Sequence, residues 1–123
     1  LKEISYIHSE AYAAGELKHG TISLITDDVP VVGLVTQSNL IEKTVSNLKE
    51  VNARNARVLA ICAPRAESLL YFADDLVVLP QAPDEVMPSL SVIPLQLISY
   101  HIAVLRGCDV DKPRNLAKSV TVE

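Results

Sequence analysis

Three short apolar runs stand out along the chain, at residues 31–36, 56–63 and 76–80. Each is rich in Val, Leu, Ile and Ala, and each is preceded or followed by Pro, Asp, Asn or Arg. Apolar runs without polar alternation are typical of parallel strands that are covered on both faces. The pattern therefore predicts three parallel strands.

The segments around the first of these runs have helical periodicity instead. Apolar residues repeat at intervals of three and four over residues 1–14, which predicts a first helix that ends at a left-handed Gly15. Residues 15–20, bounded by two glycines, are expected to form a loop or a single turn. Asn39 and Glu42 have the spacing of a capping box at the start of a second helix, and Asn55 is a suitable left-handed cap at its end. The expected apolar faces are Ile4, Ile7, Ala11 and Ala14 in the first helix, and Ile41, Val45, Leu48 and Val51 in the second.

The last part of the chain is expected to contain a short helix at residues 64–72 and a long apolar helix at 89–106. Pro94 implies a kink or a late start in the long helix, and Gly107 is expected to end it. Strands that alternate with helices predict an α/β fold, a three-layer αβα sandwich with a parallel sheet and right-handed crossovers.

Two features suggest that the chain is an incomplete fragment of such a fold. Three strands are few for a sheet of this kind, and the helical phase begins at residue 1 without a capping residue. We expect residues 1–107 to be part of one domain and residues 108–123 to be an irregular tail. A polar tail of this kind is either a frayed end or a lid that carries one reactive group, Lys118, to a site built elsewhere.

Composition and charge exclude several classes of function. The net charge is −4 and the pI is about 5.3, which argues against a nucleic-acid-binding protein. No apolar run reaches the roughly 18 residues of a membrane span. Cys62 and Cys108 have no CxxC spacing, so we expect two buried, reduced thiols in a cytoplasmic protein. We expect no cofactor and no metal site, because GxGxxG and P-loop motifs are absent and the three histidines lack a metal-like spacing.

Three residues are candidates for chemistry, and each also has a plainer interpretation. His19, in the glycine-bounded segment, is either a surface side chain or a general acid/base near neutral pH. Glu3, at the edge of the first apolar stripe, is either a solvated carboxylate or a general base whose pKa is raised by desolvation. Lys118 is either one of eleven basic residues or an amine that attacks a ketone and forms an imine. If that segment is helical, Arg114, four residues earlier, would favour the neutral amine. Periodicity alone does not decide between these interpretations.

Four sequence segments carry a family resemblance that covers the whole chain. They read LKEISYIH from residue 1, EAYAAGELKHG from residue 10, PLQLISYH from residue 94 and DVDKPRNLAKSVTVE from residue 109. These segments resemble the C-terminal end of the glucosamine-6-phosphate synthase family. The resemblance implies the second sugar-isomerase (SIS) subdomain, a flavodoxin-like parallel α/β sandwich, followed by the family's C-terminal tail.

The resemblance also implies roles for individual residues. Lys118 would form a Schiff base with an open-chain ketose, and Glu3 would move a proton between its C1 and C2. His19 would assist ring opening in the site of a neighbouring subunit, and Ala117 would contact substrate through its backbone. Thr21 departs from the family, which commonly has proline after ELKHG, so the loop is expected to be less rigid there.

The implied substrates and partners follow from the same resemblance. They are fructose 6-phosphate and glucosamine 6-phosphate, a second copy of the chain in a homodimer, a glutaminase domain and a first SIS subdomain. The chain alone is then expected to be inactive. A phosphosugar-sensing SIS module that binds without reacting is the main alternative, and a related deglycase or sugar-phosphate isomerase is a third possibility. Neither alternative requires the ending NLAKSVTVE.

Overall fold

The computed structural model describes residues 1–114 of the chain, and these residues form two compact units. The sheet unit comprises residues 12–94. The terminal unit comprises residues 1–11 together with the chain from residue 95 onward.

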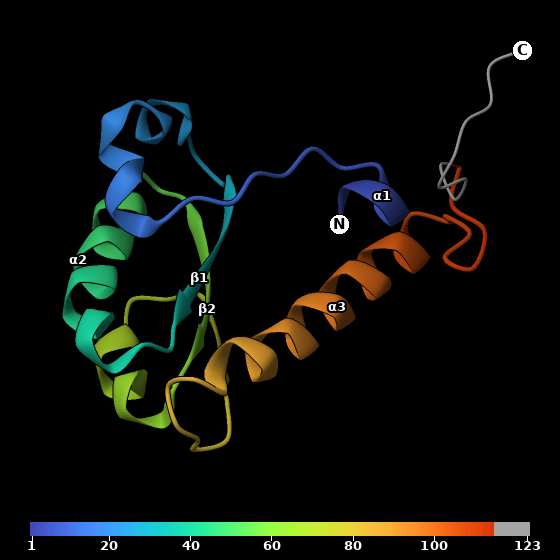
Figure 1. Cartoon of the computed structure of the whole chain (residues 1–123). Coiled ribbons are helices and arrows are strands. Elements are labelled where there is room, and N and C mark those ends of the chain that lie inside the picture. Colours follow the sequence, from blue (N-terminus) through green and yellow to red (C-terminus); the bar gives the residue numbers. More distant parts are fainter. Residues whose placement is uncertain (115–123) are drawn as a thin grey trace, which may run out of the picture. The chain divides into compact units, whose positions relative to one another are not determined.

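The sheet unit contains three parallel strands in the order β1-β2-β3 (Figure 1). They are β1 (Pro30–Val35), β2 (Arg57–Cys62) and β3 (Asp75–Val78). Pro30 pairs with Arg57 at the start of the first ladder, and Leu59 pairs with Asp75 at the start of the second. The three apolar runs of the sequence are therefore the three strands, within a few residues at each end, and the predicted parallel α/β class is confirmed.

Helix α2 (Ile41–Asn52) covers one face of this sheet (Figure 1). Its predicted apolar face is confirmed, because all four of its members are at most 8% exposed. They pack into one cluster with the strand residues that point to the same face. The buried members of the cluster are Val35, Ile41, Val45, Leu48, Val51, Ala56, Val58, Ala60, Cys62, Ala66 and Leu70.

The predicted capping box at the start of α2 does not form. No side chain caps the helix, and residues Ser38–Leu40 instead make a short 3₁₀ turn, η3, ahead of it. The α-helix consequently begins two residues after Asn39, so the Asn39 side chain is not at the capping position. At the other end, Asn55 adopts the predicted left-handed conformation, with φ of 61°, but it does not cap the helix, because α2 ends at Asn52 and Ala53 is its cap.

Three further 3₁₀ segments complete the sheet unit. They are η1 (Ala14–His19), η2 (Thr21–Leu24) and η4 (Pro64–Leu70). The predicted turn at residues 15–20 corresponds to η1, but Gly15 lies inside it and is not a helix cap. The short helix expected at residues 64–72 is the 3₁₀ segment η4.

The predicted first helix over residues 1–14 is wrong. Only Lys2–Ser5 is helical, as α1, and Tyr6 ends it in a left-handed conformation with φ of 57°. The expected stripe does not enter a core, since Ile4 and Ile7 are half-buried and Ala11 is exposed. A short helix without tertiary packing is only marginally stable, and the periodic pattern alone does not supply that packing.

Helix α3 (Met87–Leu105) begins in the sheet unit and continues into the terminal unit. It starts two residues before the predicted position and runs through Pro94. Gly107, with φ of 70°, ends it as predicted. The Gly107 N–H donates to Val104 O and the Cys108 N–H donates to Ala103 O, each at 2.9 Å, which is a Schellman motif.

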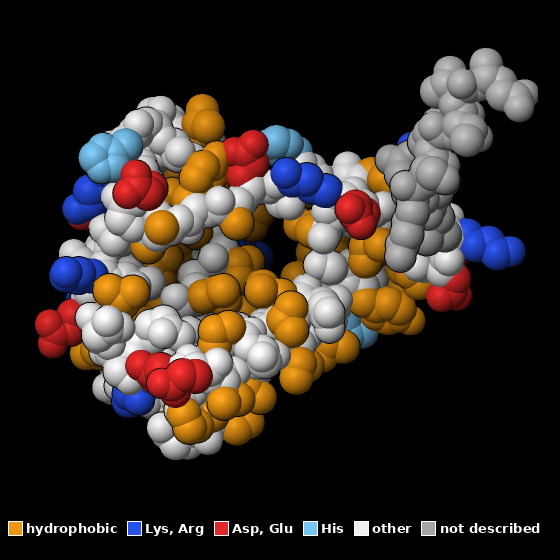
Figure 2. Space-filling view, in the orientation of Figure 1, with side chains coloured by type: hydrophobic (Ala, Val, Ile, Leu, Met, Phe, Trp, Pro, Cys, Tyr) orange, Lys and Arg blue, Asp and Glu red, His pale blue; other side chains and the backbone are white. Residues whose placement is uncertain are grey.

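The surface over α3 is rich in hydrophobic side chains (Figure 2). By length and composition the helix could cross a membrane, with a mean hydropathy of 1.4 over its best window. The sequence predicted a long apolar helix here but no apolar run of membrane-spanning length, because serine, glutamine and histidine side chains are spaced along it. One such helix is weak support for a membrane segment, since helices of soluble proteins pass the same test. Its exposed apolar side chains are Val92, Ile93, Leu97, Tyr100, Val104 and Leu105.

Candidate functional site

Glu3 lies in the single turn of α1 in the terminal unit, and its side chain is exposed. Ser5, two residues later, is fully buried and donates its hydroxyl to Leu1 O at 2.7 Å. The turn is thus held by its own serine, and it presents Glu3 to solvent. Within this chain, the exposed position of Glu3 therefore differs from the half-buried, desolvated position that was expected for a general base.

His19 is the last residue of η1 in the sheet unit, and it too is exposed. Two neighbours fix the segment that carries it. Leu17 packs against the core cluster, and Lys18 Nζ lies 2.6 Å from Glu50 Oε1 on α2. Gly20 follows with φ of 141°, a conformation that favours glycine. The backbone is therefore anchored immediately before His19, whose imidazole is exposed.

The other predicted site residues, Ala117 and Lys118, lie outside the described residues. Of the two predicted site residues that the structure describes, Glu3 belongs to the terminal unit and His19 to the sheet unit. His8 was expected within a helix, but it lies beyond the end of α1, with Nε2 at 3.6 Å from Glu10 Oε1. His101 is within α3 as expected, and its ring contacts Tyr100 edge-on.

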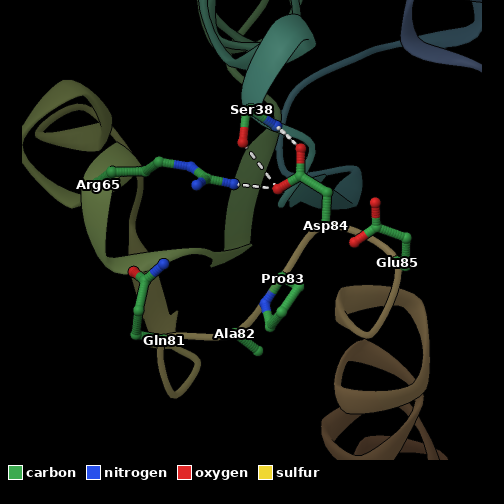
Figure 3. Close-up of a pocket in the computed structure, with 7 residues that line it drawn as sticks. All are labelled: Ser38, Arg65, Gln81, Ala82, Pro83, Asp84 and Glu85. Carbon is green, nitrogen blue, oxygen red and sulfur yellow. Dashed lines mark hydrogen bonds and ion pairs between the residues drawn. The ribbon is translucent and has the colours of Figure 1, made fainter.

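A shallow, open pocket lies at the carboxyl edge of the sheet (Figure 3). Its residues come from the segments that follow the three strands in turn. Ser38 follows β1, Arg65 follows β2, and the rest belong to the connection between β3 and α3. Carboxyl ends of parallel strands meet at one edge of a sheet, which is where α/β folds bind ligands. The lining residues are Ser38, Arg65, Gln81, Ala82, Pro83, Asp84 and Glu85.

Asp84 is the centre of the hydrogen bonds in this pocket. Its carboxylate accepts the Ser38 N–H at 2.9 Å, the Ser38 hydroxyl at 2.7 Å and a guanidinium N–H of Arg65. Figure 3 shows the serine and the arginine converging on the carboxylate. The hydrogen bonds from Ser38, followed by the hydrogen bond and the charge of Arg65, lower the pKa of the Asp84 carboxyl below its ordinary value.

We call Ser38, Arg65 and Asp84 the clasp, because their contacts join the segments that follow the three strands. These polar groups are already bonded to one another, which limits what they can bind or activate. Arg65 and Asp84 neutralise one another, and the Ser38 hydroxyl donates to a carboxylate. The Ser38 hydroxyl would become a better nucleophile only if a base took its proton. Two further bonds join the same segments, from Gln37 Nε2 to Asp84 O at 3.2 Å and from Arg65 to Thr36 O at 3.3 Å. We conclude that the cluster connects the ends of the three strands.

Ser38, Arg65 and Asp84 were not among the candidate site residues predicted from the sequence. Their position in the sequence could have indicated a site, since each residue follows a predicted strand and the carboxyl ends of parallel strands lie at one edge of the sheet. Within residues 1–114, no group of three or more His, Cys, Asp or Glu side chains could hold a metal ion.

Comparison with known proteins identifies the family. The SIS domain model matches residues 1–106. The whole chain is 58% identical to a glutamine–fructose-6-phosphate aminotransferase (isomerizing) of Symbiobacterium thermophilum and 54% identical to that of Chlorobaculum tepidum. It spans 20% of the length of each of these relatives.

A solved structure agrees with this assignment. It is the C-terminal domain of glucosamine-fructose-6-phosphate aminotransferase from Francisella tularensis, which is 42% identical with a TM-score of 0.85. The similarity covers 90% of this chain and 31% of that one. With a family model matched over residues 1–106 and a similar solved fold, the chain belongs to the SIS domain family.

Proposed function

We propose that this chain is the C-terminal isomerase part of an enzyme that makes glucosamine 6-phosphate from fructose 6-phosphate and glutamine. The observation that carries the proposal is the identity of 54–58% over all 123 residues to aminotransferases of that name. This identity extends through the tail that contains Lys118, which a module that only binds a phosphosugar does not need. The reaction would take place in the cytoplasm.

Lys118 is the proposed nucleophile. Its neutral amine adds to the C2 carbonyl of the open-chain ketose, and loss of water leaves an imine between Nζ and C2. Ammonia released from glutamine by another part of the enzyme then replaces the lysine at C2, so the product nitrogen is that of ammonia. The backbone of Ala117 is proposed to contact the sugar beside this bond.

Glu3 and His19 are proposed to move protons. Glu3 takes a proton from C1 of the imine and returns it to C2, which converts a ketose derivative into an aldose derivative. His19 exchanges a proton with the ring oxygen or the anomeric hydroxyl and so opens the cyclic sugar. Both side chains are exposed in this chain, so other parts of the enzyme would have to close the site around them.

His19 is proposed to act in the site of a second copy of the chain, which requires a homodimer. Mixing two inactive full-length variants, His19→Ala and Lys118→Arg, tests this directly. In a shared-site dimer, mixed dimers regain one complete site and activity returns on subunit exchange. If each site is built within one chain, the mixture stays inactive.

The central test is an intact-mass measurement on a polypeptide that contains this chain and the rest of the isomerase region. It is incubated with fructose 6-phosphate and cyanoborohydride, which reduces an imine to a stable amine. The expected result is a single sugar-phosphate adduct that is absent from Lys118→Arg and present in Lys112→Arg, a control in the same segment. Phosphosugar binding without an adduct at Lys118 would contradict the proposal and favour the sensing module.

A further inference from the structure

Helix α3 carries no Asp, Glu, Lys or Arg side chain over its 19 residues. An ordinary surface helix has one apolar face toward the core, and charged or polar residues cover its other side. A helix that is apolar on all sides is instead typical of a helix that is buried on all sides. The composition of α3 therefore predicts a partner for each of its sides.

One side of α3 is covered within the terminal unit. Ala103 is 0% exposed, and the neighbouring Ile98, Ser99 and Ile102 are half-buried. Because these residues are about one helical turn apart, they lie on the same side of the helix. This is the side on which α3 packs within its own unit.

The other segments of the terminal unit are short and are held to one another. The single turn of α1 is closed by Tyr6, whose N–H donates to Lys2 O at 3.1 Å. The Tyr6 hydroxyl accepts the backbone N–H of Arg114 at 2.9 Å, and the Arg114 guanidinium carbon lies 4.3 Å from the centre of the Tyr6 ring. Segments of this size do not enclose a helix.

The opposite side of α3 in the terminal unit is apolar and exposed. Leu97, Tyr100 and Val104 recur at intervals of three and four residues and are 53%, 46% and 48% exposed, and the adjacent Leu105 is 86% exposed. We call these four residues the α3 stripe. They are among the hydrophobic side chains that lie over this helix in Figure 2.

A membrane fits this stripe poorly. Met87 and Ser91, in the first turns of α3, are 0% and 3% exposed within the sheet unit, so this end of the helix already lies in a protein core. Gln96 and His101 are exposed beside the stripe, and lipid would remove their polar groups from water without offering hydrogen-bond partners. A protein surface offers such partners.

A second copy of the chain also fits the stripe poorly. Four side chains that are about half exposed or more offer on the order of a few hundred Å² of apolar area, and a stable complex of separate chains buries about 800 Å² on each partner. A segment of the same polypeptide needs less area, because linkage gives it a high effective concentration. The similarity covers only 31% of the solved Francisella tularensis domain, so most of that domain is formed by other residues.

We propose that the α3 stripe is the surface on which another part of the same isomerase polypeptide packs, through an uncharged, apolar helix face. Intervals of three and four residues form the ridges that fit the grooves of a second helix. The inference rests on the function proposed above, because that function places this chain in a longer polypeptide. It assigns the stripe to assembly of the isomerase and not to contact with the sugar.

Hydroxyl-radical footprinting of the polypeptide that contains the rest of the isomerase region tests this without any substitution. Radicals oxidise exposed side chains, so two tyrosines can be compared directly by peptide mapping. Tyr71 of the sheet unit is the matched control, being 79% exposed in this chain against 46% for Tyr100. We expect Tyr100 to be oxidised at least about tenfold more slowly than Tyr71, because the core of an interface is packed like a protein interior.

The same measurement distinguishes the possible partners. Protection of Tyr100 should be unchanged when the polypeptide is diluted and when phospholipid vesicles are added or omitted. Oxidation of Tyr100 and Tyr71 at rates within about twofold, which is the difference in their exposure in this chain, would show that the stripe is free and overturn the inference. Protection that is lost on dilution would assign the stripe to a second copy, and protection that requires vesicles would assign it to a membrane; either result overturns the inference.

A pair of variants adds a second readout. Tyr100→Lys places a charge in the proposed contact and should lower the unfolding temperature of the longer polypeptide by at least about 5 °C. Tyr71→Lys should lower it by less than about 2 °C, as expected for an exposed position. Equal shifts would contradict the inference.

Failure of this inference can be told apart from failure of the proposed function. Absence of the sugar-phosphate adduct at Lys118 would overturn the proposed function, and footprinting does not depend on that reaction. Formation of the adduct in a polypeptide whose Tyr100 is as reactive as Tyr71 would leave the function standing and overturn the packing of the stripe.

Discussion

Leu48 of α2 fills the space that a side chain on Gly33 of β1 would occupy. A Cβ built on Gly33 would lie 2.5 Å from Leu48 Cδ1 and 2.8 Å from Cδ2. Gly33 is buried in the sheet, and Leu48 is 3% exposed. The absence of a side chain at Gly33 is therefore what allows α2 to approach the strand closely.

The first prediction is that Gly33→Ala destabilises the chain. The added methyl forces Leu48 to move inside a packed core, and such overpacking costs about 1–3 kcal/mol. Gly15→Ala is the control, because nothing lies within 4 Å of a Cβ at Gly15. Urea unfolding should show a lower midpoint for Gly33→Ala only. Equal midpoints for the two variants would mean that Leu48 relaxes without cost.

The second prediction concerns acid stability and the clasp at the sheet edge. Ser38 and then Arg65 lower the pKa of the Asp84 carboxyl in the folded chain. A lowered folded pKa contributes stability above the unfolded value, about 3.9, and that contribution is lost as the pH falls through the folded pKa. The chain should therefore lose more stability than Asp84→Asn when the pH is lowered from about 6 to about 3.

Urea unfolding over a series of pH values measures this difference. Asp28→Asn serves as a control, because Asp28 is an exposed carboxylate in a left-handed conformation that asparagine also tolerates. It should keep the acid sensitivity of the original chain. Identical pH profiles for Asp84→Asn and the original chain would contradict the prediction.

The third prediction concerns the two thiols, which are both free. Burial, and secondarily the charge of Glu67, raises the pKa of the Cys62 thiol. Cys62 is 0% exposed in the core, whereas Cys108 is half-buried. A disulfide reagent should therefore react quickly with Cys108 and react with Cys62 only on unfolding. The fast phase should disappear in Cys108→Ser and persist in Cys62→Ala, and the reverse assignment would refute the prediction.

The fourth prediction concerns the turn between α2 and β2. Asn55 has φ of 61°, donates Nδ2–H to Asp27 Oδ1 at 2.9 Å, and accepts the Asp28 N–H at its carbonyl at 2.9 Å. Asn55→Ala should lower the free energy of unfolding by about 1–3 kcal/mol through backbone strain and the lost bond. Asn55→Gly should cost less, since glycine accepts this conformation. Thermal unfolding compares the two, and an equal loss would exclude the backbone contribution.

The fifth prediction separates proton transfer from imine formation. In the polypeptide with the rest of the isomerase region, Glu3→Gln should still form the Lys118 adduct. Exchange of the C1 protons of fructose 6-phosphate in deuterated water should slow at least about 100-fold, because a positioned general base contributes this much or more. Glu42→Gln, an exposed carboxylate at the start of α2, is the control. Undiminished exchange in Glu3→Gln would remove Glu3 from the proposed mechanism.

The sheet and its covering helix could be predicted because their signals are local. Apolar runs marked the three strands, and the 3.6-residue period of Ile41, Val45 and Leu48 marked the buried face of α2. Gly107 and Asn55 could be predicted for the same reason, since a left-handed backbone restricts the residue at that position. The first helix was wrong because its stripe was equally periodic but had no core to pack against.

The candidate site residues also fall into a group that the sequence indicated and a group that it did not. The residue types and motifs around Glu3, His19 and Lys118 were sufficient to indicate a family, and their roles stay predictions. The clasp of Ser38, Arg65 and Asp84 was not predicted. Ser38 lies 46 positions and Arg65 lies 19 positions from Asp84 in the sequence, and no periodic pattern relates the three residues.

The sequence by itself determined the order of the three strands and of the helices α2 and α3, the class of fold, the buried face of α2 and the family. These depend on short-range periodicity, backbone preference and motifs that can be read along the chain. Only the tertiary structure decided that Asp84 connects the ends of the strands, that Leu48 occupies the space over Gly33 and that Tyr6 holds Arg114. Contacts between residues 15, 46 or 108 positions apart arise from the packing of whole elements, and a local pattern carries no information about them.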